Sequence, residues 1–176
     1  VTTDNERSKT ARKMVLELLL ADQPEQIIAH DPASLLWHWI DKSKLGGSRF
    51  PSRNDTPTPD TSHTAMSVNL DACIHCNLCV RACREVQVND VIGMAHRGAE
   101  SQIVFDMADP MGDSTCVACG ECVQACPTGA LMPNSLLDEN QVFKGGATEA
   151  TNSLCPYCGV GCQLTFFTKD DTILYV

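Results

Sequence analysis

Aromatic residues are scarce in this 176-residue sequence. Phe, Trp and Tyr make up 5% of it, so a large core of bulky side chains is not expected and something else must hold part of the fold together. Basic residues are outnumbered by acidic residues, 13 to 22, which gives a formal net charge of −9. Because nucleic-acid recognition begins with a basic face, this charge favours a protein partner and argues against nucleic acid.

Long apolar runs are missing as well. No stretch of about 18 apolar residues occurs, so we expect no membrane span. The sequence also lacks a phosphate-binding glycine-rich loop and a convincing Ser/His/Asp set. These absences leave redox transfer as the chemistry that the sequence favours.

Cysteine is abundant, with eleven residues in three tight groups. An odd number would leave one thiol outside any disulfide framework, and close grouping is more typical of metal ligands. Thiolates bound to metal persist in a reducing compartment, whereas disulfides persist mainly in oxidising ones. We therefore expect a cytoplasmic metalloprotein.

Two of the cysteine groups repeat one spacing. The segments "CIHCNLCVRAC" and "CVACGECVQACP" both follow C-x₂-C-x₂-C-x₃-C. In bacterial runs of this kind three thiolates bind one [4Fe–4S] cluster, and the fourth cysteine binds the other cluster. The expected ligands are Cys73, Cys76, Cys79 and Cys126 for the first cluster, and Cys116, Cys119, Cys122 and Cys83 for the second.

Zinc is the alternative for these cysteines. Zinc sites usually use two separated C-x₂-C pairs, and a third cysteine three residues beyond such a pair suits a cube better. Because the spacing already supplies four thiols for each cluster, His75 is expected to be free or hydrogen-bonded instead of a ligand. The other four histidines are expected to be surface or packing residues: His30, His38, His63 and His96.

The remaining pattern predicts an α+β fold that begins with a helical segment over residues 1–45. A capping box at Thr3–Glu6 predicts a helix up to about residue 21, with an apolar stripe from Ala11 to Leu19. Asp31 and Pro32 predict the start of a second helix, whose apolar residues include Trp37 and Ile40. We expect these two helices to pack on a neighbour.

The later boundaries follow changes in composition. Residues 46–66 are rich in Gly, Ser, Thr and Pro, which predicts a linker or a strap along the surface. Residues 67–135 form the expected two-[4Fe–4S] ferredoxin-like domain, with a strand at 66–70 and a strand pair at 91–96 and 102–106. Residues 136–150 are expected to be a connector, and residues 151–176 a cluster-binding hairpin that turns at 169–171.

The third cysteine group, "CPYCGVGC", contains Cys155, Cys158 and Cys162. A cube and a tetrahedral zinc site both need four ligands. Either another part of the chain supplies the fourth ligand, or the sequence stops before the site is complete.

This group and its neighbours resemble a known family. "CPYCGVGCQL" is similar to the first three cluster ligands at the start of the molybdopterin-binding domain in formate dehydrogenase catalytic subunits. The stretch from "CVRACREVQVND" to "CVACGECVQACPTGALMP" resembles the same proteins, particularly the soluble NAD-dependent alpha subunits. The resemblance covers nearly the whole chain, and the order of its modules is more specific than any one motif.

The resemblance implies an internal piece of a longer catalytic subunit. A preceding [2Fe–2S] domain, the fourth ligand of a third [4Fe–4S] cluster, and a molybdenum or tungsten bis-molybdopterin guanine dinucleotide would lie in the missing parts. The implied function is electron transfer from formate oxidation toward a flavin- and NAD-binding, diaphorase-type partner subunit. No catalytic residue is expected within the 176 residues.

One departure separates this sequence from some relatives. Some family members carry a His-plus-three-Cys cluster that begins at an Asp-His-Pro triplet, where this sequence has Asp22-Gln23-Pro24. No cysteine follows until Cys73, so we expect that cluster to be absent. Two alternatives are a free-standing ferredoxin-type carrier and a fragment of an [FeFe]-hydrogenase. The third cysteine group argues against both, since a carrier does not need it and hydrogenase ligands lack its close spacing.

Overall fold

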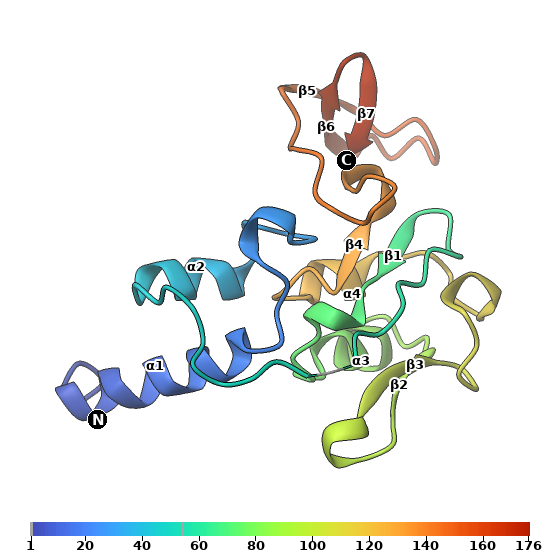
Figure 1. Ribbon diagram of the computed structural model, residues 1–176. Coiled ribbons are helices and arrows are strands. Elements are labelled where there is room, and N and C mark those ends of the chain that lie inside the picture. Colours follow the sequence, from blue (N-terminus) through green and yellow to red (C-terminus); the bar gives the residue numbers. More distant parts are fainter. Residues whose placement is uncertain (1, 54) are drawn as a thin grey trace.

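The computed structural model describes residues 2–53 and 55–176 and has three parts (Figure 1). A pair of helices near the N-terminus lies beside a central unit of short helices and strands, and a small C-terminal sheet lies above that unit in this view. Within the described residues, none of the helices is long and apolar enough to cross a membrane.

The helical segment contains α1 (Glu6–Leu20), the 3₁₀ turn η1 (Gln26–Ile28) and α2 (Leu35–Lys42). Both helices were predicted, but their caps were not. Asn5, rather than Thr3, accepts the backbone N–H of Ser8 at 2.8 Å. Ser34 caps α2, and the Asp31 carboxylate accepts the N–H of Ala33 in the preceding turn. Several residues near each start can act as a cap, and tertiary packing selects among them.

Both helices contribute to an apolar cluster on the central unit. Its buried members are Ala29, Leu36, Trp37 and Ile40. Leu16, Leu19 and Leu20 of α1 pack against them, while Met14, Val15 and Leu18 of the predicted stripe stay exposed. Ile74, which lies between the first two cysteines of the first run, joins the same cluster. The expected packing of the helices on a neighbour is confirmed, and the neighbour is this cysteine run.

Residues 46–53 and 55–64 follow the surface as a strap. The backbone N–H of Arg53 donates to Asp22 at 2.8 Å, and the Arg53 guanidinium donates to the Asp71 carbonyl at 2.8 Å. Farther along, Asp60 and Val68 exchange two backbone hydrogen bonds of 2.9 Å. The strap thus connects the helical segment with the residues just before Cys73.

The central unit contains two antiparallel strand pairs and two short helices. Strand β1 (Met66–Val68) pairs with β4 (Leu131–Pro133), and β2 (Ile92–Ala95) pairs with β3 (Gln102–Phe105). The helices are α3 (Leu78–Arg81), extended by the π-helical turn η3 (Ala82–Val86), and α4 (Glu121–Ala125). Four 3₁₀ turns complete the unit: η2 (Leu70–Ala72), η4 (Gly98–Glu100), η5 (Met111–Asp113) and η6 (Asn134–Leu136). The predicted strands at 66–70, 91–96 and 102–106 are confirmed to within two residues.

The core of this unit is small and made of aliphatic side chains and cysteines. Met66, Val68, Ile103, Phe105 and Met111 are buried with Cys83 and Cys122, and further cysteines pack against them. Phe105 is the one aromatic member of this buried cluster. The core therefore agrees with the low aromatic content of the sequence.

The C-terminal sheet has the order β5 (Glu149–Leu154), β6 (Gln163–Lys169) and β7 (Thr172–Tyr175). The β6–β7 hairpin was predicted, and Asp170 and Asp171 have the left-handed backbone conformation of its turn. Strand β5 was not predicted, because its sequence "EATNSL" is polar and every residue in it is exposed. The third cysteine group forms the loop between β5 and β6.

Candidate metal centre

The two repeated cysteine runs fold in the same way. The residue before the second cysteine has a left-handed backbone in both, with φ of 54° at His75 and 57° at Ala118. The residue after the second cysteine does too, with φ of 62° at Asn77 and 77° at Gly120. Glycine and asparagine adopt this conformation readily, whereas histidine and alanine do so at a steric cost. The shared strain indicates that the loop shape itself matters.

The loop shape turns backbone N–H groups toward sulfur. The N–H of His75 donates to Cys73 Sγ at 3.5 Å, and the N–H of Ala118 donates to Cys116 Sγ at 3.4 Å. Successive backbone N–H groups in such loops form concave sites for anions, including iron–sulfur clusters. Each run therefore prepares a partly positive site for a group of thiolates.

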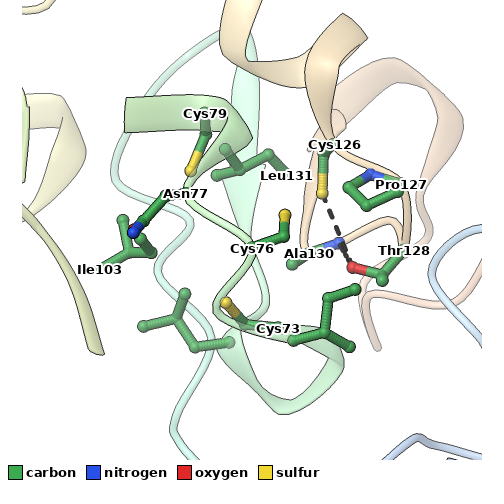
Figure 2. Close-up of a pocket in the computed structure, with 12 residues that line it drawn as sticks. Cys73, Cys76, Asn77, Cys79, Ile103, Cys126, Pro127, Thr128, Ala130 and Leu131 are labelled. Carbon is green, nitrogen blue, oxygen red and sulfur yellow. Dashed lines mark hydrogen bonds between the residues drawn. The ribbon is translucent and has the colours of Figure 1, made fainter. Parts of the chain in front are cut away.

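One cavity gathers four cysteines from both halves of the repeat. Cys73, Cys76 and Cys79 line it together with Cys126, which follows α4. Their sulfur atoms are directed into a shared space in Figure 2. The rest of the lining is mainly apolar, including Leu70, Ile103 and Leu131. This lining shields Cys73, Cys79 and Cys126, which are half-buried, whereas Cys76 is exposed.

A second cavity gathers the other four cysteines of the repeat. Cys116, Cys119 and Cys122 line it with Cys83, which lies in η3 after α3. The N–H of Val91 donates to Cys83 Sγ at 3.4 Å. The two cavities are similar in size, with about 380 and 310 Å³ of atom-free space. Each cavity thus combines three cysteines of one run with the last cysteine of the other.

Burial makes three of the eight thiols hard to ionise without a bound cation. Burial first, and neighbouring cysteines second, raise the pKa of Cys79 and of Cys122 to about 12 each. Burial also raises the pKa of Cys73. Because metals bind thiolates, a metal that entered either cavity would have to displace these protons and compensate the charge.

The sulfurs surround a volume instead of a point. Among the residues that the structure describes, no three His, Cys, Asp or Glu side chains converge as the ligands of a single ion would. A [4Fe–4S] cube, by contrast, fills the space between its four ligands with iron and sulfide. The two cavities therefore fit a cube by the number, identity and spread of their ligands.

The third cysteine group is open to solvent. Cys158 and Cys162 are exposed and Cys155 is half-buried, in a loop closed by a 2.8 Å hydrogen bond from the Cys155 N–H to the Cys162 carbonyl. Tyr157 within the loop is 89% exposed. The structure thus brings three predicted ligands into one loop, and the other eight cysteines of the sequence line the two cavities described above.

The first cavity is supported by side chains that the motifs did not reveal. Gln23 donates to the Ala72 carbonyl at 3.1 Å, in the turn that leads to Cys73. His30 is buried, with Nε2 2.8 Å from the Asp71 carboxylate and Nδ1 bonded to the Gln141 carbonyl. Burial opposes the charge on His30, but these two partners outweigh it and raise its pKa. No local signal in the sequence indicates these contacts, because Asp71 lies 41 residues from His30.

His75 lies outside the group of residues that line the first cavity. Its side chain is exposed and borders a neighbouring open cleft, together with Arg53 and His96. His63 Nδ1 accepts the N–H of Ala65 at 3.1 Å, and the His38 ring packs edge-on against Trp39. These positions agree with the expectation that the histidines are surface or packing residues. Among them, buried His30 has a hydrogen-bond partner on each ring nitrogen.

Two parts of the chain match known family models. Residues 72–130 match the 4Fe-4S dicluster domain, and residues 148–176 match the molybdopterin oxidoreductase Fe4S4 domain. The chain is therefore a mixed helix and sheet protein with these two iron–sulfur domains in sequence. The dicluster match contains all eight cysteines of the two cavities, and the second match contains the third cysteine group.

Similar proteins are much longer than this chain. A curated Staphylococcus haemolyticus protein named "Putative formate dehydrogenase" is 30% identical over 141 residues, which are 60% of this chain and 14% of that protein. A Bacillus subtilis protein named "Probable oxidoreductase YjgC" is 26% identical over 172 residues, covering 78% of this chain and 18% of that protein. The chain thus spans less than a fifth of these relatives.

The fold also occurs in a solved structure. A chain in the crystal structure of an NAD+-reducing [NiFe]-hydrogenase in the H2-reduced state superposes with a TM-score of 0.68 and 24% identity. The match covers 74% of this chain and 57% of that chain. At this identity the likeness concerns the fold alone.

Proposed function

We propose that this chain, which has the two iron–sulfur domains of a molybdopterin oxidoreductase, relays electrons within a formate dehydrogenase. The observation that carries the proposal is the gathering of eight cysteines into two crossed groups of four, followed along the chain by the molybdopterin oxidoreductase Fe4S4 match. The relatives named as formate dehydrogenases support formate as the electron donor. Formate would yield CO₂, two electrons and a proton at a pterin-bound molybdenum or tungsten outside these residues.

The proposed ligands are the eight cysteines of the two cavities. Cys73, Cys76, Cys79 and Cys126 would hold one [4Fe–4S] cluster, and Cys116, Cys119, Cys122 and Cys83 the other. A bound cluster supplies one-electron transfer without a large change in structure. The chain's own residues hold the thiolates in place, donate backbone N–H groups to their sulfurs, and exclude water with apolar side chains.

The third group would hold another [4Fe–4S] cluster through Cys155, Cys158 and Cys162. We propose that a cysteine beyond residue 176 provides its fourth ligand. The matches cover only 14% and 18% of the lengths of two relatives, which supports that proposal. Electrons from formate would pass through this cluster to the dicluster unit, and from there to a flavin- and NAD-binding partner subunit in the cytoplasm.

The first test is cofactor content. The 176-residue protein, prepared without oxygen, should hold two [4Fe–4S] clusters in residues 67–135, measured by Mössbauer spectroscopy and by iron and sulfide analysis. Four irons or fewer after full reconstitution, or stoichiometric zinc, would contradict the assignment.

The second test uses the intact catalytic subunit with its partner. EPR should show that formate reduces both clusters of the dicluster unit and that NAD+ reoxidises them. Clusters that assemble but do not respond to formate would retain the electron-transfer role and remove formate as the donor. Reduction by formate without reoxidation by NAD+ would remove the proposed partner.

A further inference from the structure

Thr128 lies in the loop directly after the proposed ligand Cys126. Its side chain is buried, with 2% of its surface exposed, and it lines the first cavity. Thr128 Oγ1 lies 3.7 Å from Cys126 Sγ, as the dashed line in Figure 2 shows. The same oxygen accepts the backbone N–H of Ala130 at 3.4 Å.

These two contacts fix the direction of the bond to sulfur when iron is bound. A hydroxyl has one hydrogen to donate and two lone pairs to accept with. The Ala130 N–H uses a lone pair, which leaves the hydrogen for Cys126. A thiolate that ligates iron has lost its own hydrogen and can only accept, so the Thr128 O–H donates to Cys126 Sγ.

We propose that this hydrogen bond raises the reduction potential of the cluster held by Cys73, Cys76, Cys79 and Cys126. The inference rests on the proposed function, because it requires a cluster on these ligands. Reduction adds negative charge to the cluster and its thiolates, so a donor to sulfur stabilises the reduced state more than the oxidised state. Because Thr128 is buried, water is poorly placed to replace its hydrogen bond.

The corresponding place beside the second cavity is built differently. Two residues after Cys83 stands Glu85, whose carboxylate is exposed and paired with Arg81 at 3.0 Å. Cys83 receives its hydrogen bond from the backbone of Val91 instead. A change at Thr128 should therefore shift the reduction potential of the first cluster and leave that of the second cluster unchanged. The driving force for electron transfer between the two clusters changes as a result.

The test compares Thr128→Val with Thr128→Ser in the anaerobically prepared 176-residue protein. Valine keeps the shape and removes the hydroxyl, whereas serine keeps the hydroxyl. EPR-monitored redox titration should show a lower potential for one cluster in Thr128→Val. At a fixed potential the ratio of reduced to oxidised cluster should fall about three- to tenfold, as expected for one hydrogen bond. A tenfold change corresponds to about 59 mV in a one-electron couple.

Two further measurements keep the test decisive. Cys126→Ser exchanges a ligand of the same cluster and so identifies which EPR signal belongs to it. ENDOR spectroscopy in H₂O and D₂O should show an exchangeable proton near that cluster that is present in the unchanged protein and in Thr128→Ser and is lost in Thr128→Val, whereas the exchangeable proton of the His75 N–H, which donates to Cys73 Sγ, stays in all three. Thr128→Ala removes the same hydroxyl and takes the place of Thr128→Val if the valine variant does not fold.

Absence of two [4Fe–4S] signals in the unchanged protein would defeat the proposed function. If both signals are present, the inference is overturned by equal potentials in all three proteins. A serine variant that shifts as far as the valine variant, or the same set of exchangeable protons in the unchanged protein and in Thr128→Val, would overturn it as well.

Discussion

Replacing Gly129 by alanine tests how tightly the helical segment is bound to the loop that follows Cys126. Gly129 has φ of +81°, and a Cβ atom added there would lie 2.6 Å from the Asp31 Cβ and 2.8 Å from the Asp31 backbone nitrogen. Rotation of a side chain cannot relieve this overlap, so the backbone before α2 has to move. Close by, the Leu36 N–H donates to the Pro127 carbonyl at 3.0 Å and connects the same two segments.

The expected cost has two parts. A left-handed backbone costs about 1–2 kcal/mol for alanine relative to glycine. Forcing an extra carbon into a packed contact adds about 1–3 kcal/mol. The matched control is Gly98→Ala, at φ of +65° in the turn between β2 and β3, where an added Cβ meets nothing within 4 Å. Gly98→Ala should therefore lose only the free energy of the left-handed backbone, about 1–2 kcal/mol.

Hydrogen exchange measured by mass spectrometry provides the assay. Peptides that cover residues 31–42 should exchange about 5- to 150-fold faster in Gly129→Ala, which is the added 1–3 kcal/mol expressed as local opening. The same peptides should be unchanged in Gly98→Ala. Equal exchange in both variants, with both proteins folded and loaded with iron, would refute a close contact between Gly129 and Asp31.

Three other predictions follow from the site. Cys83→Ser should disturb the cluster on Cys116, Cys119 and Cys122, because Cys83 lines that cavity; EPR showing the loss in the Cys73 group instead would contradict the crossed ligands. His30 should contribute fully to the free energy of unfolding below its unfolded pKa near 6.5, and this contribution should be lost as pH rises through its raised folded pKa. Denaturation experiments on His30→Gln should therefore show a free energy of unfolding that lacks this dependence on pH. Cys155→Ser in the intact subunit should leave the two dicluster signals in place and slow their reduction by formate, which rapid-freeze EPR would measure.

The short strands and the shape of the C-terminal hairpin could be predicted from local sequence. Met66 and Val68 alternate in β1, and Asp170 and Asp171 provide a turn that tolerates a left-handed backbone. Strand β5 could not be predicted in this way. It has no apolar face, and its pairing with β6 from Glu149 to Leu154 depends on the neighbouring strand.

The helix starts show a second limit of local patterns. Thr3 and Asn5 can both cap α1, and Asp31 and Ser34 both precede α2. The sequence alone gives no energetic reason to choose between them, since these residue types differ little as caps. The choice depends on where the chain meets the rest of the molecule, as with the Leu36 N–H, which reaches Pro127 from the first turn of α2.

In the candidate site, too, local sequence predicts one part and contacts between distant residues decide the other. Cysteine spacing indicates three ligands of each cluster, because they are close in sequence, and the known ligation of such runs assigns the fourth cysteine to the other cluster. The support for the Cys73 turn comes from residues scattered through the first third of the chain. Gln23, His30 and Arg53 all bond to the residues from Leu70 to Ala72, and no motif connects them.

The predicted domain boundary at residue 67 does not separate the first cavity from the residues that support it. All eight proposed dicluster ligands lie between residues 67 and 135, but the turn before Cys73 has two backbone carbonyls, those of Asp71 and Ala72, that accept bonds from Arg53 and Gln23. Without these donors both carbonyls would need water beside an apolar cavity, which is costly for a buried polar group. The helical segment and the strap therefore belong physically to the first cavity, although their sequences contain none of its cysteines.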